Sequence, residues 1–433
     1  MSCPLNILSQ SVSAALGVIL LVTPTLASDS TPSPGVIDLP SLDAKEQSWV
    51  ADPKKIPGPV RMGFGRNVPV EAVVDVFAAT QWQQTPSGGH VAAVKLHSPG
   101  ALGLRIGLQL SILPEASLLG FFDANGTRAA AFSGAELNVA DGPFWSPLIQ
   151  GDTASLALSL PPGYDPSNVH LSLPRVSHLL SWPFHKTDTS AATGNQCRLD
   201  ATCHPDWAMA SRATALLLYT DEIGGTDTCT GTLLRDGDPT TDIPYVVTAQ
   251  HCVPDQHRAA SIETVWLHRT ATCNSPDAAP IQSVSGGAEL LHGDPLTDIS
   301  LLRLRRPPLP GAAFADWSTN RPAPGTPLAS VHHPHGRRQA IAIGSITDTL
   351  PCAEVPLCEG QAGDDEDHYL VIDWNQGGTD FGSSGAGLFL PSGELVGVLH
   401  GGFGDCADSP GPDHYGRFDL TYGAGLYRWL GQR

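Results

Sequence analysis

The sequence predicts a mostly β protein, because frequent Gly and Pro residues separate short apolar runs and few long helical patterns occur. Its 433 residues include 45 glycines and 38 prolines; 41% of the residues are hydrophobic and 15% are charged. These proportions are typical of a globular chain, and the length suits two domains or more. The net charge of -19 argues against a nucleic-acid partner, since binding phosphates requires a basic face.

Residues 1–27 are expected to form a signal peptide. The apolar run at 14–22 is too short to span a bilayer, and small residues at 25–27 offer a cleavage site. The first basic residue is Lys45, so the usual positive charge near the N-terminus is missing. A buried N-terminal helix is the alternative, which Pro24 and the polar segment after it disfavour. We therefore expect secretion, extracellular or periplasmic, with no membrane partner and with disulfides permitted.

Four segments between Val68 and Leu180 have the apolar patterns of strands, and turn residues separate them. The segments are 73–77, 90–96, 104–108 and 154–158, with turns at 123–126 and 161–164. They predict a β-sandwich over about 68–180, after a Pro-, Ser- and Asp-rich linker or loosely attached strand at 28–67. Trp145 is interpreted as a core aromatic; an exposed platform for carbohydrate is the alternative.

The stretch Gly-Ser-Ser-Gly-Ala-Gly at 382–387 predicts a tight turn that aims several backbone N–H groups at one point. In acyl transfer, Ser384 Oγ would attack a carbonyl while the N–H groups of Gly382 and Ser384 receive the oxyanion. His251 follows one apolar run and Asp298 begins another, which offers a base and an acid. Alone, Asp298 could simply cap a turn. The order His, Asp, Ser is that of chymotrypsin-type proteases, whereas α/β-hydrolases have Ser first.

Several motifs after Lys186 together resemble the bacterial lysyl endopeptidases, which are secreted, trypsin-like serine proteases made as precursors. The motifs are Cys229-Thr-Gly-Thr-Leu-Leu, Thr248-Ala-Gln-His-Cys, Thr297-Asp-Ile-Ser-Leu-Leu, His332-His-Pro, Gly382-Ser-Ser-Gly, Leu399-His-Gly-Gly and Asp413-His-Tyr-Gly-Arg. The resemblance extends to a short terminal helix at 426–430. It implies an all-β fold class: a chymotrypsin-like double β-barrel at 187–433, preceded by a propeptide at 28–186 that contains the sandwich.

The resemblance also implies the roles of individual residues. His251 would be the base, Asp298 its orienting acid and Ser384 the nucleophile. The substrate-binding residues would be Asp413, His400 and Gly401, and a lysine side chain would need the Asp413 carboxylate as its partner. Two departures stand out. The loop at 350–366 has no aromatic residue to stack on His400, and Ser383 stands where trypsin has an aspartate that captures a new N-terminal amine.

Disulfides and lysines complete these expectations. Lys186 lies in a polar stretch that is expected to be exposed, and proteases cut exposed connectors most readily. Lys186 is therefore the expected processing site. All five lysines lie at or before Lys186, so a lysine-specific enzyme would not digest its own catalytic part. The resemblance implies three disulfides and leaves two cysteines to pair with each other, giving the pairs Cys197–Cys406, Cys203–Cys273, Cys229–Cys252 and Cys352–Cys358.

No metal or organic cofactor is expected, because the cysteines lack a zinc-type spacing. The histidines at 332–335 could bind a metal, but a structural turn is the preferred interpretation. The expected partners are protein or peptide substrates and the chain's own propeptide, and the enzyme is expected to be a monomer. The alternatives are a related protease that cleaves after Arg or Glu, and a non-catalytic binding or adhesion protein.

Overall fold

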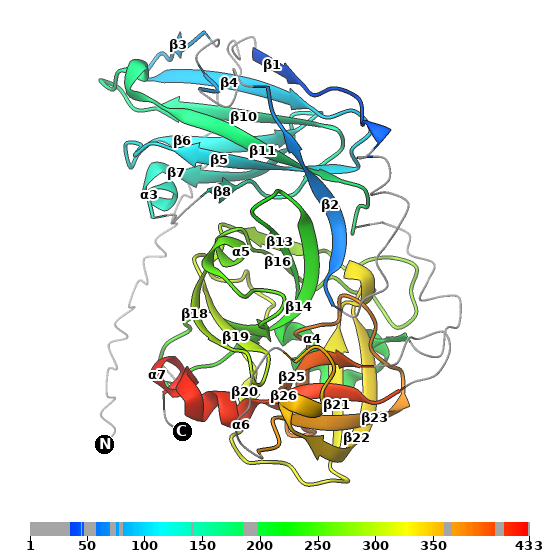
Figure 1. The fold of residues 1–433 in the computed structure, drawn as a ribbon. Helices are drawn as coiled ribbons and strands as arrows, with labels where there is room; N and C mark the ends of the chain where they lie inside the picture. Colours follow the sequence, from blue (N-terminus) through cyan, green and yellow to red (C-terminus); the bar gives the residue numbers. More distant parts are fainter. Residues whose placement is uncertain are drawn as a thin grey trace, which may run out of the picture. The chain divides into compact units, whose positions relative to one another are not determined.

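The computed structural model describes residues 35–44, 46, 58–69, 75–77, 81–139, 143–184, 198–238, 240–358, 366–402 and 411–431 (Figure 1). These residues belong to one compact unit, 32–433. The predicted signal peptide, Lys186 and the predicted pair Cys197–Cys406 lie outside the described residues. Within the described ranges, no helix has the length and apolar character needed to cross a membrane.

Two β-sheets face each other in the N-terminal part. The first contains β1 (Gly35–Asp38), β3 (Gln83–Gln84), β4 (His90–His97), β6 (Leu118–Asp123), β7 (Arg128–Ser133) and β10 (Thr153–Leu160). The second contains β2 (Val60–Asn67), β5 (Gly103–Leu110), β8 (Phe144–Trp145), β9 (Ile149–Gln150) and β11 (Leu171–Leu179). Apolar side chains from both sheets, such as Leu156 and Ile106, form one core. The predicted β-sandwich is confirmed.

Three details of this region differ from the sequence-based expectation or decide between its alternatives. Asp75–Phe77, predicted as part of a strand, is a turn in which the Asp75 carboxylate accepts the Phe77 N–H (2.9 Å). The strands β1 and β2 lie before residue 68 and extend the sandwich into the stretch interpreted as a linker or loosely attached strand. Trp145 is 4% exposed, so it is a core residue and not a surface platform.

A strongly curved sheet follows. It contains β13 (Thr214–Thr220), β14 (Thr226–Leu234), β15 (Tyr245–Ala249), β16 (Glu263–Trp266), β17 (Gln282–Ser285), β18 (Ala288–Asp294) and β19 (Ile299–Leu304). Every residue of β13, β14 and β15 is buried, which explains why these segments are continuous apolar and threonine-rich runs. β14 also pairs with β2, so a single hydrogen-bonded sheet continues from this barrel into the sandwich.

The second barrel is closed. Its strands are β21 (Pro327–His332), β22 (Ala340–Leu350), β23 (Tyr369–Gln376), β24 (Gly387–Phe389), β25 (Glu394–Gly402) and β26 (Asp413–Arg417). They follow the order β22, β21, β24, β25, β26, β23, and β23 pairs back onto β22. Side chains from both barrels, including Val247 and Val331, share a core with the terminal helices. The predicted all-β fold with a chymotrypsin-like double barrel is confirmed.

The remaining elements are short. They are β12 (Leu199–Asp200), β20 (Asp316–Trp317), α3 (Gly134–Leu137), α4 (Ala208–Ala213), α5 (Gln256–Ala260), α6 (Phe418–Thr421), α7 (Tyr427–Leu430), the π-helix η6 (Tyr422–Leu426) and the 3-10 turns η1 (Pro166–Asn168), η2 (Ala201–Cys203), η3 (Pro205–Trp207), η4 (Pro334–Gly336) and η5 (Cys352–Glu354). The disulfides Cys203–Cys273, Cys229–Cys252 and Cys352–Cys358 are formed as expected.

Candidate active site

His251 and Asp298 lie together because they are at paired ends of two neighbouring strands. β15 and β19 are antiparallel, with Ala249 opposite Ile299, so the loop after β15 meets the residue before β19. The Gln250 N–H donates to the Asp298 carbonyl (2.9 Å) and continues the ladder by one step. Cys252 is bonded to Cys229 on β14, which ties the His251 loop to the adjacent strand. Residues 47 positions apart are thereby held in contact.

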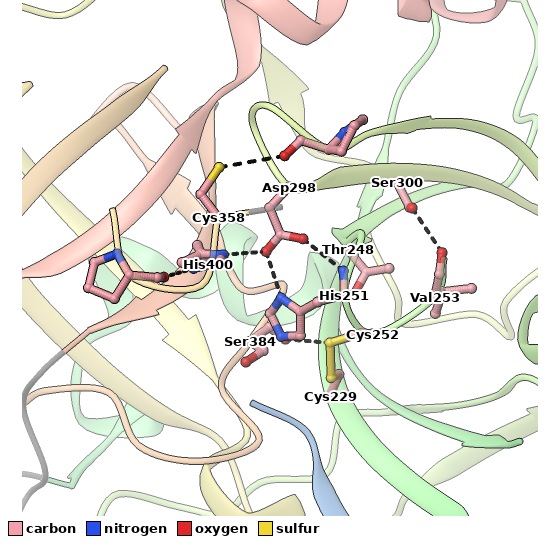
Figure 2. A network of polar contacts seen from close by, with 12 residues as sticks. Cys229, Thr248, His251, Cys252, Val253, Asp298, Ser300, Cys358, Ser384 and His400 are labelled. Carbon is pink, nitrogen blue, oxygen red and sulfur yellow. Dashed lines mark hydrogen bonds and ion pairs between the residues drawn. A yellow bond between two sulfur atoms is a disulfide. The ribbon is translucent and has the colours of Figure 1, made fainter. Parts of the chain in front are cut away.

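The Asp298 carboxylate is surrounded by hydrogen-bonding groups (Figure 2). Its Oδ1 accepts the backbone N–H of His251 (2.7 Å), and its Oδ2 lies 2.6 Å from His251 Nδ1 and 2.7 Å from His400 Nδ1. Burial by itself raises the pKa of Asp298, but the two imidazoles hold that pKa well below its usual range. Asp298 also has a left-handed backbone (φ 54°), a conformation that non-glycine residues adopt mainly at constrained sites.

Ser384 lies beside the His251 ring, on the side away from Asp298 (Figure 2). Its carbonyl accepts the Thr230 N–H (2.8 Å), which anchors the serine turn to β14. Among the described residues, His251 Nε2 is buried and makes no hydrogen bond. This nitrogen is therefore open to receive a proton, while Nδ1 faces the carboxylate.

The serine turn depends on glycine at two positions. Gly382 and Gly385 have φ values of 83° and 85°, in the left-handed region. A Cβ on Gly385 would lie 2.2 Å from the Thr230 carbonyl oxygen, so a side chain there is excluded. The Gly382 N–H is directed at the carbonyl of Gly58, which accepts it at 3.3 Å.

Ser383 makes a contact that the sequence did not predict. Its Oγ lies 2.7 Å from His332 Nδ1 and accepts the Asp380 N–H (3.1 Å). Burial lowers the pKa of His332 to about 3, so this imidazole is neutral. His332 therefore orders the serine turn through a neutral hydrogen bond to Ser383. Ser383 is the residue that stands where trypsin has a charged aspartate.

The histidines at 332–335 contact different partners. His333 Nδ1 lies 2.8 Å from the Arg337 carbonyl, and His335 Nε2 lies 3.1 Å from the Asp380 carboxylate. Together with the η4 turn, these contacts support the structural interpretation. A different group, His251, Asp298 and His400, has its ligand atoms within 4.8 Å of one another, but Asp298 already engages Nδ1 of both rings.

Asp413 lies on β26 and is 2% exposed. Its Oδ2 accepts the Trp374 Nε1–H and the Thr379 hydroxyl, each at 2.6 Å. Burial raises the pKa of Asp413 to about 6 in spite of these two bonds. Its Oδ1 faces Gly402, where a Cβ would lie 1.9 Å away. Within the described ranges no cationic side chain pairs with this carboxylate, so it is suited to a cation from outside the chain.

His400 and Gly401 lie on β25, and His400 is next to the Asp298 carboxylate. His400 Nε2 is 2.8 Å from the Pro356 carbonyl, and the Tyr369 ring meets the His400 ring edge-on at 5.5 Å. The loop at 350–366 contains no aromatic residue, and the ring beside His400 comes from β23 in an edge-on contact, not as the stacked aromatic of the resemblance. Sequence reasoning missed Tyr369, Trp374 and Thr379, because the first two look like ordinary strand residues and the third like a turn.

Comparisons with known proteins assign the chain to a family. The family model described as "Lysyl endopeptidase, C-terminal domain" matches residues 191–416, and that described as "Lysyl endopeptidase N-terminal domain" matches 38–180. A lysyl endopeptidase of Pseudomonas aeruginosa is 32% identical over 387 residues, which cover 84% of this chain and 80% of that protein.

Solved structures of other proteases also match parts of the chain. They include "HtrA-type protease AlgW with tripeptide" (18% identity, TM-score 0.36, 52% of this chain and 64% of that one) and the serine endoprotease from Yersinia pestis (19% identity, TM-score 0.35, 50% and 63%). The chain spans less than two thirds of either structure. On the two family models and the Pseudomonas aeruginosa relative, the chain belongs to the lysyl endopeptidase family and is a serine endopeptidase.

Proposed function

We propose that the protein cleaves peptide bonds after lysine and that Asp413 selects the lysine. The observation that carries this proposal is a fully buried carboxylate with two neutral hydrogen-bond donors and no cation beside it among the described residues. A buried carboxylate of this kind gains most from a partner of opposite charge. An entering lysine ammonium supplies that charge.

The arrangement around Asp413 favours lysine over arginine. Trp374 and Thr379 both donate to Oδ2, so the oxygen facing Gly402 is the one left for a ligand. A compact ammonium can form an ion pair with a single oxygen, whereas a guanidinium binds best through two parallel hydrogen bonds to both carboxylate oxygens. Cleavage after Arg or Glu, the alternative from the sequence, fits this carboxylate less well.

The proposed reaction passes through an acyl-enzyme on Ser384. Ser384 Oγ attacks the scissile carbonyl and His251 Nε2 takes its proton, while Asp298 holds the ring and balances the imidazolium charge. The N–H groups of Gly382 and Ser384 receive the oxyanion. His251 then gives the proton to the leaving amine, and water hydrolyses the ester by the same route. The hydrogen bonds that the Asp298 carboxylate accepts from His251, and the His251 Nε2 that makes no hydrogen bond to a described residue, support these roles.

The proposal includes a secreted precursor. Residues 1–27 would direct export, and the enzyme itself would cut after Lys186, giving a mature N-terminus at Thr187. Cys197 and Cys406 would pair in the mature enzyme. The family's separate N-terminal and C-terminal models, which meet between residues 180 and 191, support a boundary at this place.

The test uses the processed enzyme and peptides that differ only in Lys, Arg or Glu before one bond. We expect cleavage of the Lys peptide alone. Ser384→Ala should abolish it, and the precursor of this variant should remain uncut at Lys186. Ser392→Ala, in an exposed turn, is the matched control and should cleave normally. Equal cleavage of the Lys and Arg peptides, or an active Ser384→Ala enzyme, would contradict the proposal.

A further inference from the structure

The carbonyl of Gly58, from the N-terminal part of the chain, occupies a position that belongs to a substrate. It accepts the N–H of Gly382 at 3.3 Å, and this N–H is one of the two donors proposed for the oxyanion. In acyl transfer, the carbonyl at such a donor is the one that the nucleophile attacks. Gly58 therefore stands where the residue before the scissile bond would stand, and Pro59 follows where the leaving amine would be.

The next residues lie against β14 as a bound peptide would. β2 is antiparallel to β14, with Val60 opposite Thr228 and Arg61 opposite Asp227. The blue ribbon near Ser384 and Cys229 in Figure 2 is this segment. Proteases and other peptide-binding proteins commonly bind an extended ligand as an added strand. In this register Val60 and Arg61 are the second and third residues after the scissile bond.

The segment resembles a substrate but lacks what cleavage requires. Gly58 has no side chain to reach Asp413, so the charge pairing proposed for lysine is absent. Pro59 makes a tertiary amide with a fixed ring at the position of the leaving group. The contacts that bind this segment hold its ground state, and binding energy that does not stabilise the transition state does not accelerate cleavage. Gly58–Arg61 therefore occupies the site without being an efficient substrate.

Arg61 enters an acidic site that is shaped for it. Its Nη2 is 3.0 Å from Asp221 Oδ2 and its Nε is 2.7 Å from Asp227 Oδ1. The two aspartates are 6% and 7% exposed, respectively. Asp221 Oδ1 accepts the N–H groups of Ile223 (3.1 Å) and Gly225 (2.7 Å), which fixes this carboxylate from the protease side.

Gly225 provides the space for the guanidinium. A Cβ on Gly225 would lie 1.5 Å from Arg61 Nη1 and 2.8 Å from Asp221 Oδ2. Any larger residue at this position would displace the bound side chain. The two carboxylates and the glycine therefore form a site that fits a planar guanidinium, whose own side chain remains 39% exposed.

We propose that Asp221, Asp227 and Gly225 form a substrate subsite for a basic side chain three residues after the scissile bond, and that Arg61 fills this subsite in the precursor. The inference rests on the proposed catalytic roles of Ser384 and Gly382, because these set the register. Once the N-terminal part leaves, Asp221 and Asp227 lose the guanidinium that pairs with both, and a ligand that restores this pairing is favoured. A substrate with Arg or Lys at this position does so.

The test compares processed enzyme on three peptides with the same lysine before the scissile bond and with Arg, Gln or Glu at the third position after it. We expect kcat/KM to fall in the order Arg, Gln, Glu, by about tenfold or more between Arg and Glu. In Asp227→Asn and in Gly225→Ala the ratio of Arg to Gln should fall towards one. The second variant removes space without removing charge, so either variant that folds gives an answer.

Two outcomes would overturn the subsite: equal kcat/KM for all three peptides on the wild-type enzyme, or an unchanged ratio in a folded variant. Cleavage of the Gln peptide after its lysine tests the proposed function alone. If the enzyme cuts the Gln peptide after its lysine but shows no preference for Arg, the proposed subsite is refuted and the proposed function stands. If the enzyme cuts none of the three peptides after lysine, the proposed function is refuted. The register from which the subsite was inferred is then refuted as well.

Discussion

Two aspartates in this molecule are buried to a similar extent but placed in opposite electrostatic surroundings. Asp298 is 4% exposed and Asp413 is 2% exposed. Two imidazoles and a backbone N–H surround Asp298, and its pKa is held well below the usual range. Asp413 accepts bonds from one indole N–H and one hydroxyl, and burial raises its pKa to about 6. Burial alone therefore does not determine the charge of a carboxylate; its partners do.

The difference agrees with the two proposed roles. A carboxylate that orients a base must be ionised at all times, and the groups that keep it so belong to the chain itself. A carboxylate that selects a cationic substrate is left without its counter-charge until the substrate arrives. The following predictions change one of the two sites and measure whether the other is affected, starting with the largest effect.

Asp298→Asn should lower kcat on a lysine peptide by about 10⁴-fold, because the amide no longer holds His251 in the required tautomer. KM should change little, since the lysine contact at Asp413 is untouched. Steady-state kinetics measures both, on variant enzyme whose precursor the wild-type enzyme has cut after Lys186. Asp348→Asn, an exposed aspartate, is the control. A fall in kcat of less than tenfold would show that Asp298 is not the orienting acid.

Asp413→Asn should lower kcat/KM for lysine peptides by about 10²–10³-fold, since an ammonium would then enter a buried site without a charged partner. Ser384 should still react with a small serine-directed label at the wild-type rate, because the His251 and Asp298 contacts are kept. Loss of labelling together with cleavage would mean that Asp413 supports the fold of the site and not its specificity.

The raised pKa of Asp413, about 6, predicts a pH dependence for cation binding. An alkylammonium inhibitor needs the ionised carboxylate, so its Ki should be constant above that pH. Below it, protonation removes the negative charge, and Ki should rise about tenfold per pH unit. Asp298 stays ionised in this range and contributes no change. A flat Ki between about pH 5 and 8 would contradict the assignment.

Tyr369→Leu should have the smallest effect, a decrease of about two- to tenfold in kcat, because an edge-on ring contact contributes about 0.5–1.5 kcal/mol. Tyr369→Phe keeps the ring against His400 and should behave like the wild type. Both variants should retain their preference for lysine. A stronger effect in the Phe variant than in the Leu variant would assign the role to the hydroxyl group and not to the ring.

The sequence predicted the segments that carry His251, Asp298 and Ser384, and the strands β13, β14 and β15, because fully buried strands are unbroken apolar or threonine-rich runs. It did not resolve β2, whose glycines and arginines resemble a linker; their positions make sense only against β14 and Asp227. It also missed Tyr369, since contact with His400 arises from barrel closure and not from proximity along the chain. The pKa difference between Asp298 and Asp413 likewise depends on neighbours brought together by folding.

The ladder that β2 shares with β14 and β11 has a consequence for the timing of activation. A cut after Lys186 would break one peptide bond, but β2 would remain paired on both sides, with Arg61 still held by two carboxylates. The hydrogen bonds of such a ladder break cooperatively, so detachment of β2 requires the free energy of breaking all of them together. Detachment is therefore a separate event, slower than the cut itself. Latency of the enzyme would then be governed by the dissociation rate of a strand. We expect proteolytic nicking and the appearance of activity to be distinct in time.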